Sequence, residues 1–331
     1  MTQSGHRPAP DVALAKPVSA PINALVQADT MPRPEPGEHE ASGAVVMSSE
    51  IRQARLSDVP SCARICFEAF GGLHRQQGFT PIFTSMEVVT RRVTSLIADP
   101  KVFGIVAEDD GRIVGVNFLS ESDPVRGVGP IAVDPAAQAG GIGRRLMEAA
   151  LQRAGGLPTR LLQETFNMRS MSLYASLGFE VKDLYVLVSG RPSLQHSECE
   201  VRPMTEGDLE GCERLQKKAI GFSRINELRT TLEAGTPWVA VRSGAIAAFV
   251  GSPLLWVGSH GAGEDEQSLA ALFSTAAQQT GKDVAFLLPA RSAVLFRWAL
   301  SNGMKAGRPL TLMSQGPYSP PECIYIPSVV Y

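Results

Sequence analysis

The chain has 331 residues, of which 44% are hydrophobic and 19% are charged, and its formal net charge is −2 at pH 7. This length predicts about two domains, and the composition is that of an ordinary globular protein. The near-zero charge argues against nucleic acid or an anionic membrane as a partner, and no apolar run approaches the ~18 residues of a membrane span.

Five cysteines bear on compartment and metal binding: Cys62, Cys66, Cys199, Cys212 and Cys323. They form no Cys-x-x-Cys pair, and no histidine or acidic cluster completes a metal site around the first two, which lie four residues apart. We expect reduced core thiols, no bound metal and a cytoplasmic location.

Residues 1–48 are predicted to be a disordered tail. Prolines recur from Pro8 to Pro36 and would interrupt every helix, and aromatic residues are absent. Two interpretations stay open: a docking tail, or an unstructured extension in front of a true start at Met47.

The ordered part is predicted to open with a strand at residues 51–54. A helix should begin near Ser57 and end at the glycine pair that starts with Gly71. Residues 73–84 are expected to be irregular, and a second helix is expected at residues 85–98.

A hairpin turn, Asp109-Asp110-Gly111, follows this second helix. The expected elements from here on are strands at residues 102–107, 112–119 and 131–133, a helix at 142–154, a strand at 159–165, a helix at 170–176 and a closing strand at 184–188.

The strand at residues 131–133 leads into a loop of small residues from Gln138 to Gly143, and a helix follows directly. The first N–H groups of a helix have no partner within it and carry partial positive charge, and glycines let a phosphate approach the backbone. The spacing matches neither Gly-x-x-x-x-Gly-Lys-Ser/Thr nor Gly-x-Gly-x-x-Gly. The loop therefore predicts an anion site of another kind, with a simple turn before a core helix as the alternative.

Two motifs carry a family resemblance. Gln138, Gly141 and Gly143 match Gln/Arg-x-x-Gly-x-Gly/Ala, and residues 167–179 contain Asn…Leu-Tyr…Leu-Gly-Phe in the right order. In this, the chain resembles the GCN5-related N-acetyltransferases, which hold acyl-coenzyme A on the loop. The resemblance covers about residues 49–190 and implies an α/β domain with a mixed sheet, the acyl-coenzyme A N-acyltransferase fold.

The resemblance also implies the cofactor-binding residues. Backbone groups of the strand before the loop would bind the pantetheine arm and the developing oxyanion, and N–H groups of the loop would hold the pyrophosphate. The implied residues are Ile131, Ala132, Val133, Gln138, Ala139, Gly140, Gly141, Ile142, Gly143, Arg144 and Asn167.

For the proton transfers, the resemblance implies that Tyr174 protonates the leaving thiolate, although it could instead only pack on the coenzyme. Many relatives place a glutamate base where this chain has Leu162. Glu164 is the nearest candidate, ahead of Glu121 and Asp123, with a solvated or capping carboxylate as the alternative for each. Deprotonation through water, or a neutral acceptor, also stays open.

The second half of the sequence repeats the first in degenerate form. Residues 51–65 align without a gap on 201–215, and residues 173–179 align on 298–304. We expect a tandem copy of the same fold, with chance similarity between two α/β domains as the alternative.

The second copy is expected to lack the chemistry. Its loop position, residues 261–267, is acidic and would repel a pyrophosphate, and Ala299 stands in place of the tyrosine. The predicted organisation is a tail at 1–48, an acetyltransferase domain at 49–190, a linker at 191–198, and a C-terminal domain at 199–331 that is a structural partner or a wall of the acceptor pocket. One acyl-coenzyme A site per chain follows.

The predicted function is transfer of an acetyl group from acetyl-coenzyme A to the amine of a small molecule or peptide. The alternatives are a non-catalytic acyl-coenzyme A sensor and a phosphate-binding module for another nucleotide. The segment expected to shape the acceptor pocket contains His74, Arg75, Phe79 and Phe83 but does not specify the acceptor. A monomer is favoured, because a tandem copy could bury the surface through which single-domain relatives dimerise.

Overall fold

The computed structural model describes residues 49–138, 140–257 and 260–329. All of these residues belong to one unit, Met47–Tyr331. The predicted disordered tail lies outside the described residues, as does Ala139 of the glycine loop.

The first repeat, residues 49–190, has the order of strands and helices that the sequence predicts, with one additional short strand at residues 126–128. Its elements are β1 (Glu50–Gln53), α1 (Val59–Gln76), α2 (Met86–Ala98), β2 (Val102–Asp109), β3 (Arg112–Ser120), β4 (Arg126–Val128), β5 (Ala132–Val133), α3 (Ile142–Ala154), β6 (Thr159–Glu164), α4 (Met168–Ser176) and β7 (Glu180–Gly190). Asp110 and Gly111 both have positive φ, as the tight turn between β2 and β3 requires.

The glycine pair does not end α1, which is a correction. The helix continues through Gly71 and Gly72 to Gln76, so residues 73–76 are helical and not irregular. A glycine inside a helix costs about 1 kcal/mol relative to alanine. Burial of the last turn outweighs this cost, because the side chain of His74 has no exposed surface.

The second repeat, residues 199–329, follows the same order, except that a single strand takes the place of β4 and β5 and a further strand follows at the end. Its elements are β8 (Glu200–Pro203), α5 (Leu209–Ile220), α6 (Ile225–Ala234), β9 (Trp238–Arg242), β10 (Ala245–Val250), β11 (Gly261–Gly263), α7 (Glu266–Thr280), β12 (Val284–Pro289), α8 (Ala293–Ser301), β13 (Lys305–Gln315) and β14 (Ile324–Ile326).

An ion pair at the start of each repeat confirms their equivalence. Arg52 contacts Asp58 at 2.8 Å (Nη1–Oδ2), and Arg202 contacts Asp208 at 2.7 Å through the same atoms. In both places the aspartate also accepts a backbone N–H from the residue three positions earlier. The aligned residues of the two copies therefore fix the same strand-to-helix junction.

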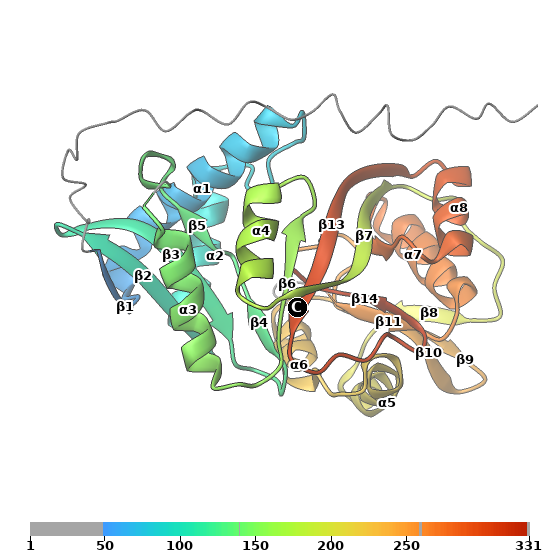
Figure 1. Cartoon of the computed structure of the whole chain (residues 1–331). Helices are drawn as coiled ribbons and strands as arrows, with labels where there is room; N and C mark the ends of the chain where they lie inside the picture. The colour runs from blue at the N-terminus through green and yellow to red at the C-terminus, as the bar shows by residue number, and fades with distance from the viewer. Residues whose placement is uncertain (1–48, 139, 258–259, 330–331) are drawn as a thin grey trace, which may run out of the picture. The chain divides into compact units, whose positions relative to one another are not determined.

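The last strands of the two repeats are exchanged. The main sheet runs in the order β1-β2-β3-β4-β6-β13-β7-β12, so β13 of the second repeat lies between β6 and β7 of the first (Figure 1). β13 pairs antiparallel with both neighbours, and β7 pairs antiparallel with β12. The expectation that residues 184–188 close the first sheet is therefore wrong.

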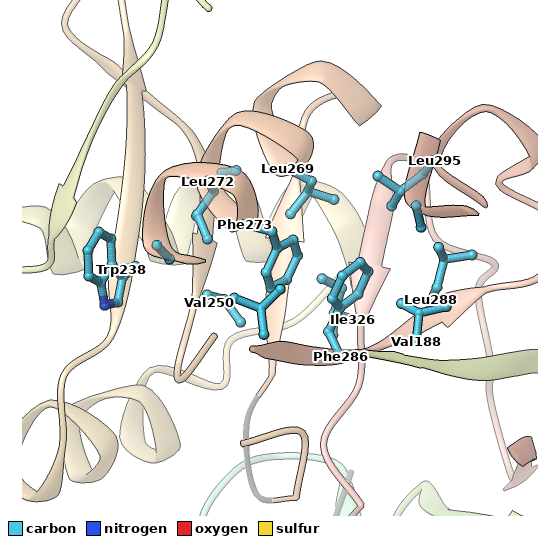
Figure 2. Close-up of a cluster of buried hydrophobic side chains, with 14 of the residues drawn as sticks. Val188, Trp238, Val250, Leu269, Leu272, Phe273, Phe286, Leu288, Leu295 and Ile326 are labelled. Atoms are coloured by element: carbon cyan, nitrogen blue, oxygen red, sulfur yellow. The ribbon is translucent and has the colours of Figure 1, made fainter. Parts of the chain in front are cut away.

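The exchange also completes both hydrophobic cores. Met313 of β13 packs with Leu161 and Tyr174 of the first repeat. Val188 of β7 belongs to the cluster around α7 and lies beside Leu288 of the second repeat (Figure 2). The division into two domains at residues 191–198 stays a prediction. Both exchanged strands, β7 and β13, pair with strands of the other repeat across this division.

Helices cover both faces of the first part of the main sheet. Val116 and Phe118 of β3 pack in a cluster that includes residues of α1 and α2. Leu119, which points to the opposite face, packs with Met147 of α3. Because side chains alternate along a strand, the glycine loop before α3 and the segment between α1 and α2 lie on opposite faces.

The second repeat forms a separate sheet in the order β14-β11-β10-β9-β8. The C-terminal strand β14 pairs antiparallel with β11 along its whole length. In the first repeat, β4 has the parallel strand β6 as its neighbour. In the second repeat, the corresponding neighbour of β11 is the C-terminal strand β14.

All five cysteines are free thiols. Cys62, Cys66 and Cys212 are buried, as expected, but Cys199 and Cys323 are partly exposed because each directly precedes an edge-lying strand. Within the described ranges, no helix is long and apolar enough to cross a membrane, and no group of three His, Cys, Asp or Glu side chains could hold a metal ion.

The Arg202–Asp208 pair predicts an acid-dependent loss of stability. Hydrogen bonds from Arg202 hold the pKa of Asp208 at about 2, below its ordinary value of 3.8. Because the folded-state pKa is depressed, this stabilisation is complete above pH ~4 and is lost as the pH falls toward 2. We expect Asp208→Asn to lower the free energy of unfolding by about 1–2 kcal/mol at pH 7 and by about half as much at pH 3.

Urea unfolding at both pH values measures this difference. Glu210→Gln is the matched control, since Glu210 lies on the same helix with its side chain 84% exposed. Equal losses for Asp208→Asn at pH 7 and pH 3 would contradict the linkage.

Candidate active site

The backbone of the first repeat opens a gap in the sheet. β3 pairs with β4 at Leu119–Val128 and with β5 at Val116–Ala132, so the β4–β5 side has one extra residue between these pairs. Such a bulge bends the strand. β6 pairs with β4 only through its first two residues. In the part of the chain that the structure describes, no strand pairs with the second edge of β5.

The free edge of β5 presents backbone groups to this gap. The N–H of Asp134 donates to the carbonyl of Val114 in β3 (N–O 2.9 Å). Because N–H groups alternate along a strand, the N–H of Val133 points away from β3. The side-chain amide of Gln138 reaches back to the carbonyl of Val133 (Nε2–O 3.4 Å). The predicted strand and loop residues are thus joined at the gap.

The glycine loop leaves the N-terminus of α3 open. Gly141 occupies the N-cap with φ +71°, and no side chain of the described residues caps the helix. The first N–H groups therefore stay available for an anion. Arg169 donates to Gln138 Oε1 at 3.1 Å, and Arg144 donates to Ser176 Oγ at 2.6 Å, so two guanidinium groups flank the loop. Of the predicted loop residues, Ile142 is buried and offers only its backbone.

The equivalent helix start in the second repeat is already capped. Asp265 Oδ1 accepts the N–H of Ser268 at 2.8 Å at the N-terminus of α7. Arg242 contacts the same carboxylate at 2.8 Å. The carboxylate of Asp265 thus occupies the start of α7, whereas the equivalent place at the start of α3 is open to an anion.

A cavity of about 120 Å³ borders the gap between β4, β5 and β6. Four of the predicted catalytic and cofactor-binding residues line it: Ile131, Glu164, Asn167 and Tyr174. The lining is mostly apolar and comes from both repeats, with Phe70, Leu73, Ile82, Phe83, Leu161 and Leu162 from the first and Trp256, Val257, Leu310 and Val329 from the second. The second repeat thus contributes to the wall of this cavity, and its role as a wall of the acceptor pocket stays a prediction.

Glu164 is buried in this lining and is held on one side only. Its Oε1 lies 2.8 Å from His74 Nε2 and 3.0 Å from Arg308 Nη1. His74 Nδ1 accepts the N–H of Ile82, so a neutral ring carries its proton on Nε2, which lies 2.8 Å from both Glu164 Oε1 and Arg308 Nη1. The second oxygen, Oε2, has no hydrogen-bond partner among the described residues.

Arg308 reaches this site because of the strand exchange. Between Ala306 and Pro309, the pairing of β13 with β7 is irregular, and Arg308 lies in this bulge. A bulge redirects side chains from the regular alternation. Arg308 also donates to the carbonyl of Thr80, so it ties the segment between α1 and α2 to β6. The guanidinium of a second-repeat residue thus fixes the first-repeat carboxylate.

Tyr174 lies on α4 with 5% of its surface exposed. Burial raises the pKa of its phenol to about 12, and a hydrogen bond with the Ser170 side chain opposes this shift. The phenol therefore keeps its proton at any physiological pH.

Asn167 forms the N-cap of α4, and its Oδ1 accepts the N–H of Ser170 at 3.2 Å. The other two candidate bases do not line the cavity: Glu121 pairs with Arg153, and Asp123 contacts Asn226. Gln163 does line it, and both atoms of its buried amide lack a partner within the described ranges.

Three contributors were not predicted from the sequence: Gln163, Arg308 and the ion-pairing role of His74. His74 and Arg308 lie 90 and 144 residues from Glu164 in the sequence. The available signal was the Gly307-Arg308-Pro309 run, whose glycine and proline indicate a bulge in a strand.

Residues 100–181 match the family model of the acetyltransferase (GNAT) domain. A mycothiol acetyltransferase from Thermomonospora curvata is 40% identical over 78 residues, which cover 22% of this chain and 26% of the relative. The N-alpha-acetyltransferase RimI from Mycobacterium tuberculosis is 36% identical over 101 residues, which cover 28% of this chain and 64% of the relative. The chain thus spans less than two thirds of either relative.

A solved tandem GNAT protein from the clavulanic acid biosynthesis pathway superimposes with a TM-score of 0.51. The match is 14% identical in sequence and covers 82% of this chain and 100% of that one. At this identity the likeness concerns the fold alone. The fold is that of tandem acyl-coenzyme A N-acyltransferases, which confirms the predicted fold class.

Loss of Arg308 should destabilise the protein, because it leaves a buried carboxylate without its cation. We expect Arg308→Met to lower the free energy of unfolding by about 3 kcal/mol, and Glu164→Gln to recover part of this loss in the double variant. Urea unfolding at pH 7 provides the measurement.

Lys305→Met is the matched control, because Lys305 is an exposed cation on the same strand. A loss below about 1 kcal/mol for Arg308→Met would show that the pair is solvated and not buried.

Proposed function

Residues 100–181 belong to the acetyltransferase (GNAT) domain family, and from this premise we propose that the chain transfers an acetyl group from acetyl-coenzyme A to an amine. One observation carries the proposal. The cavity with Glu164 and Tyr174 lies at the gap beside β5. The chain then runs from β5 through the glycine loop to the open N-terminus of α3. A thioester held in the gap would have its anionic part at the loop and its acyl part in the cavity.

The chain's own groups fit such a ligand. The uncapped N–H groups from Gly140 to Arg144 would hold the pyrophosphate, with Arg144 and Arg169 adding positive charge. The free edge of β5 from Ile131 to Val133 would bind the pantetheine arm, and Asn167 borders the same space. When bound, acetyl-coenzyme A supplies the activated acyl group.

Glu164 is proposed as the general base. An ammonium group must lose a proton before it can attack a carbonyl carbon. His74 and Arg308 hold Oε1 in place, whereas Oε2 is free to accept that proton. Many relatives place the base at the position that is Leu162 in this chain. The proposed base therefore stands two residues further along β6.

Tyr174 is proposed as the general acid. Its pKa of about 12 lies above that of a thiol in water, ~8.5, so proton transfer to a free, hydrated thiolate would be unfavourable. An apolar cavity also desolvates the sulfur and makes it more basic. The phenol should therefore donate its proton as the carbon–sulfur bond breaks.

The relatives' names refer to mycothiol and to N-alpha acetylation, which supports a small molecule or a peptide as the acceptor. We propose that the second repeat binds no coenzyme, because β14 covers β11 and Asp265 caps α7. We also propose a cytoplasmic monomer: the cysteines are free, and both exchanged strands come from one chain.

Coenzyme binding at the loop can be tested by charge. At Gly140 a new Cβ would meet nothing closer than 3.8 Å, and φ is not positive, so a side chain is tolerated there. We expect acetyl-coenzyme A at ~100 times its dissociation constant to add ~2.7 kcal/mol of stability to the parent and to Gly140→Ala. Gly140→Glu should lose this gain, because its carboxylate would repel the pyrophosphate.

Thermal melting of residues 47–331, with titration calorimetry for stoichiometry, checks this expectation. ATP and NAD serve as competing ligands. Two coenzyme molecules per chain, or an unchanged gain in Gly140→Glu, would refute the assignment of the loop.

The proton-transfer roles predict separate losses of turnover. We expect Tyr174→Phe and Glu164→Gln each to lower kcat by about 10²-fold, while the gain in melting temperature with acetyl-coenzyme A is kept. Glu121→Gln is the control, because Glu121 pairs with Arg153 outside the cavity. Thiol release in the presence of an amine measures turnover.

A loss of about threefold or less in Tyr174→Phe would remove its role as the acid, and the same result in Glu164→Gln would leave the base to water. Binding of the coenzyme without turnover of any amine would favour the sensor interpretation.

A further inference from the structure

The cavity contains a cationic side chain that the proposed acyl transfer does not use. Arg92 of α2 lines the cavity together with Glu164 and Tyr174. Its neighbour Arg91 points to solvent and pairs with Glu87 at 3.3 Å. For Arg92, no hydrogen bond or ion pair with a side chain occurs among the described residues. Arg92 thus borders the space where an acceptor would bind, and its guanidinium has no side-chain partner among the described residues.

The nearest carboxylates are engaged elsewhere. Glu227 interacts with Arg92 only through its charge, since it pairs with Arg224 and lies 3.3 Å from His260 Nδ1. Asp99, the other nearby carboxylate, accepts the N–H of Lys101. Burial lowers the pKa of Arg92 more than these charges raise it. A partly buried cation without a partner is costly, and an anionic ligand would relieve that cost.

The rest of the lining restricts what carries the anionic group. Phe70, Leu73, Phe83 and Trp256 present an apolar surface, which suits an apolar body. The free oxygen of Glu164 suits an amine, and the unpaired amide of Gln163 offers a donor NH2 group and an acceptor oxygen. A polyamine would be repelled by Arg92, and a strongly hydrated sugar would be poorly matched to the aromatic wall.

We propose that the acceptor is an apolar amino carboxylate, whose carboxylate binds Arg92 while its amine faces Glu164. This inference rests on the acyl transfer proposed above, and it narrows the acceptor from any amine to one that also carries a negative charge. Guanidinium and carboxylate form charge-assisted hydrogen bonds that a neutral amide cannot replace.

Matched pairs of acceptors test the proposal. L-Phenylalanine, L-leucine and L-methionine are compared with their amides in the presence of acetyl-coenzyme A, and kcat/KM is determined from thiol release. We expect the parent to prefer each acid over its amide by about tenfold or more. Arg92→Leu should reduce this preference by about tenfold or more, and the control Arg91→Leu should keep it.

A binding measurement separates this proposal from the acyl transfer itself. Thermal melting of the coenzyme A-loaded protein is repeated with L-phenylalanine, 3-phenylpropionate and L-phenylalaninamide. Stabilisation by the two carboxylates in the parent and in Arg91→Leu, but not in Arg92→Leu, would support the anion site even if no amine were turned over.

Equal turnover of acids and amides by the parent would overturn the proposal and leave the acyl transfer intact. Acid preference that survives in a folded Arg92→Leu would also overturn it, as would the absence of both turnover and carboxylate-dependent stabilisation.

Discussion

The exchange of β7 and β13 is the interaction on which the rest of this structure depends. A strand inside a sheet needs hydrogen-bond partners along both edges. β6 obtains its second partner, β13, from the second repeat, and β12, at the edge of the main sheet, obtains its partner β7 from the first repeat. The same two strands bring Met313 and Val188 into the core of the opposite repeat. The second repeat is thus a part of the first repeat's sheet, core and cavity, and not an appendage to it.

The strand before the central helix has a different neighbour in each repeat. In the first, a bulge separates β5 from β6 and leaves room beside β5. In the second, β14 pairs with β11 and removes that room. The glycines of β11 now serve packing, because a Cβ at Gly261 would lie 2.4 Å from the carbonyl of Phe249 and one at Gly263 would lie 2.5 Å from Leu269. Glycine in a degenerate copy therefore does not by itself indicate a phosphate site.

Short-range sequence patterns predicted most of the helices and strands, but they could not predict which distant strands pair in the sheet. The start of α3 at the glycine loop, the hairpin turn at Asp110 and the Arg–Asp junction of each repeat follow from short-range chemistry. The exchange does not, since β7 and β13 occupy equivalent places in two similar copies and either could complete either sheet. Glu164 could be singled out as a candidate because it lies near the motif, whereas Arg308 reaches it only through the exchanged strand.

This connection gives the second repeat a chemical as well as a structural part in the site. A carboxylate buried in an apolar cavity is stable as an ion only if it is paired. α1 supplies His74, β6 supplies Glu164 and β13 supplies Arg308, so the charge is balanced only when both repeats are folded and interleaved. Since the two donors converge on Oε1, they fix the carboxylate while Oε2 remains unpaired. β13 therefore has two functions: it pairs with β6 in the main sheet, and it carries the cation that holds the proposed base in place. Separating the repeats would remove both at once.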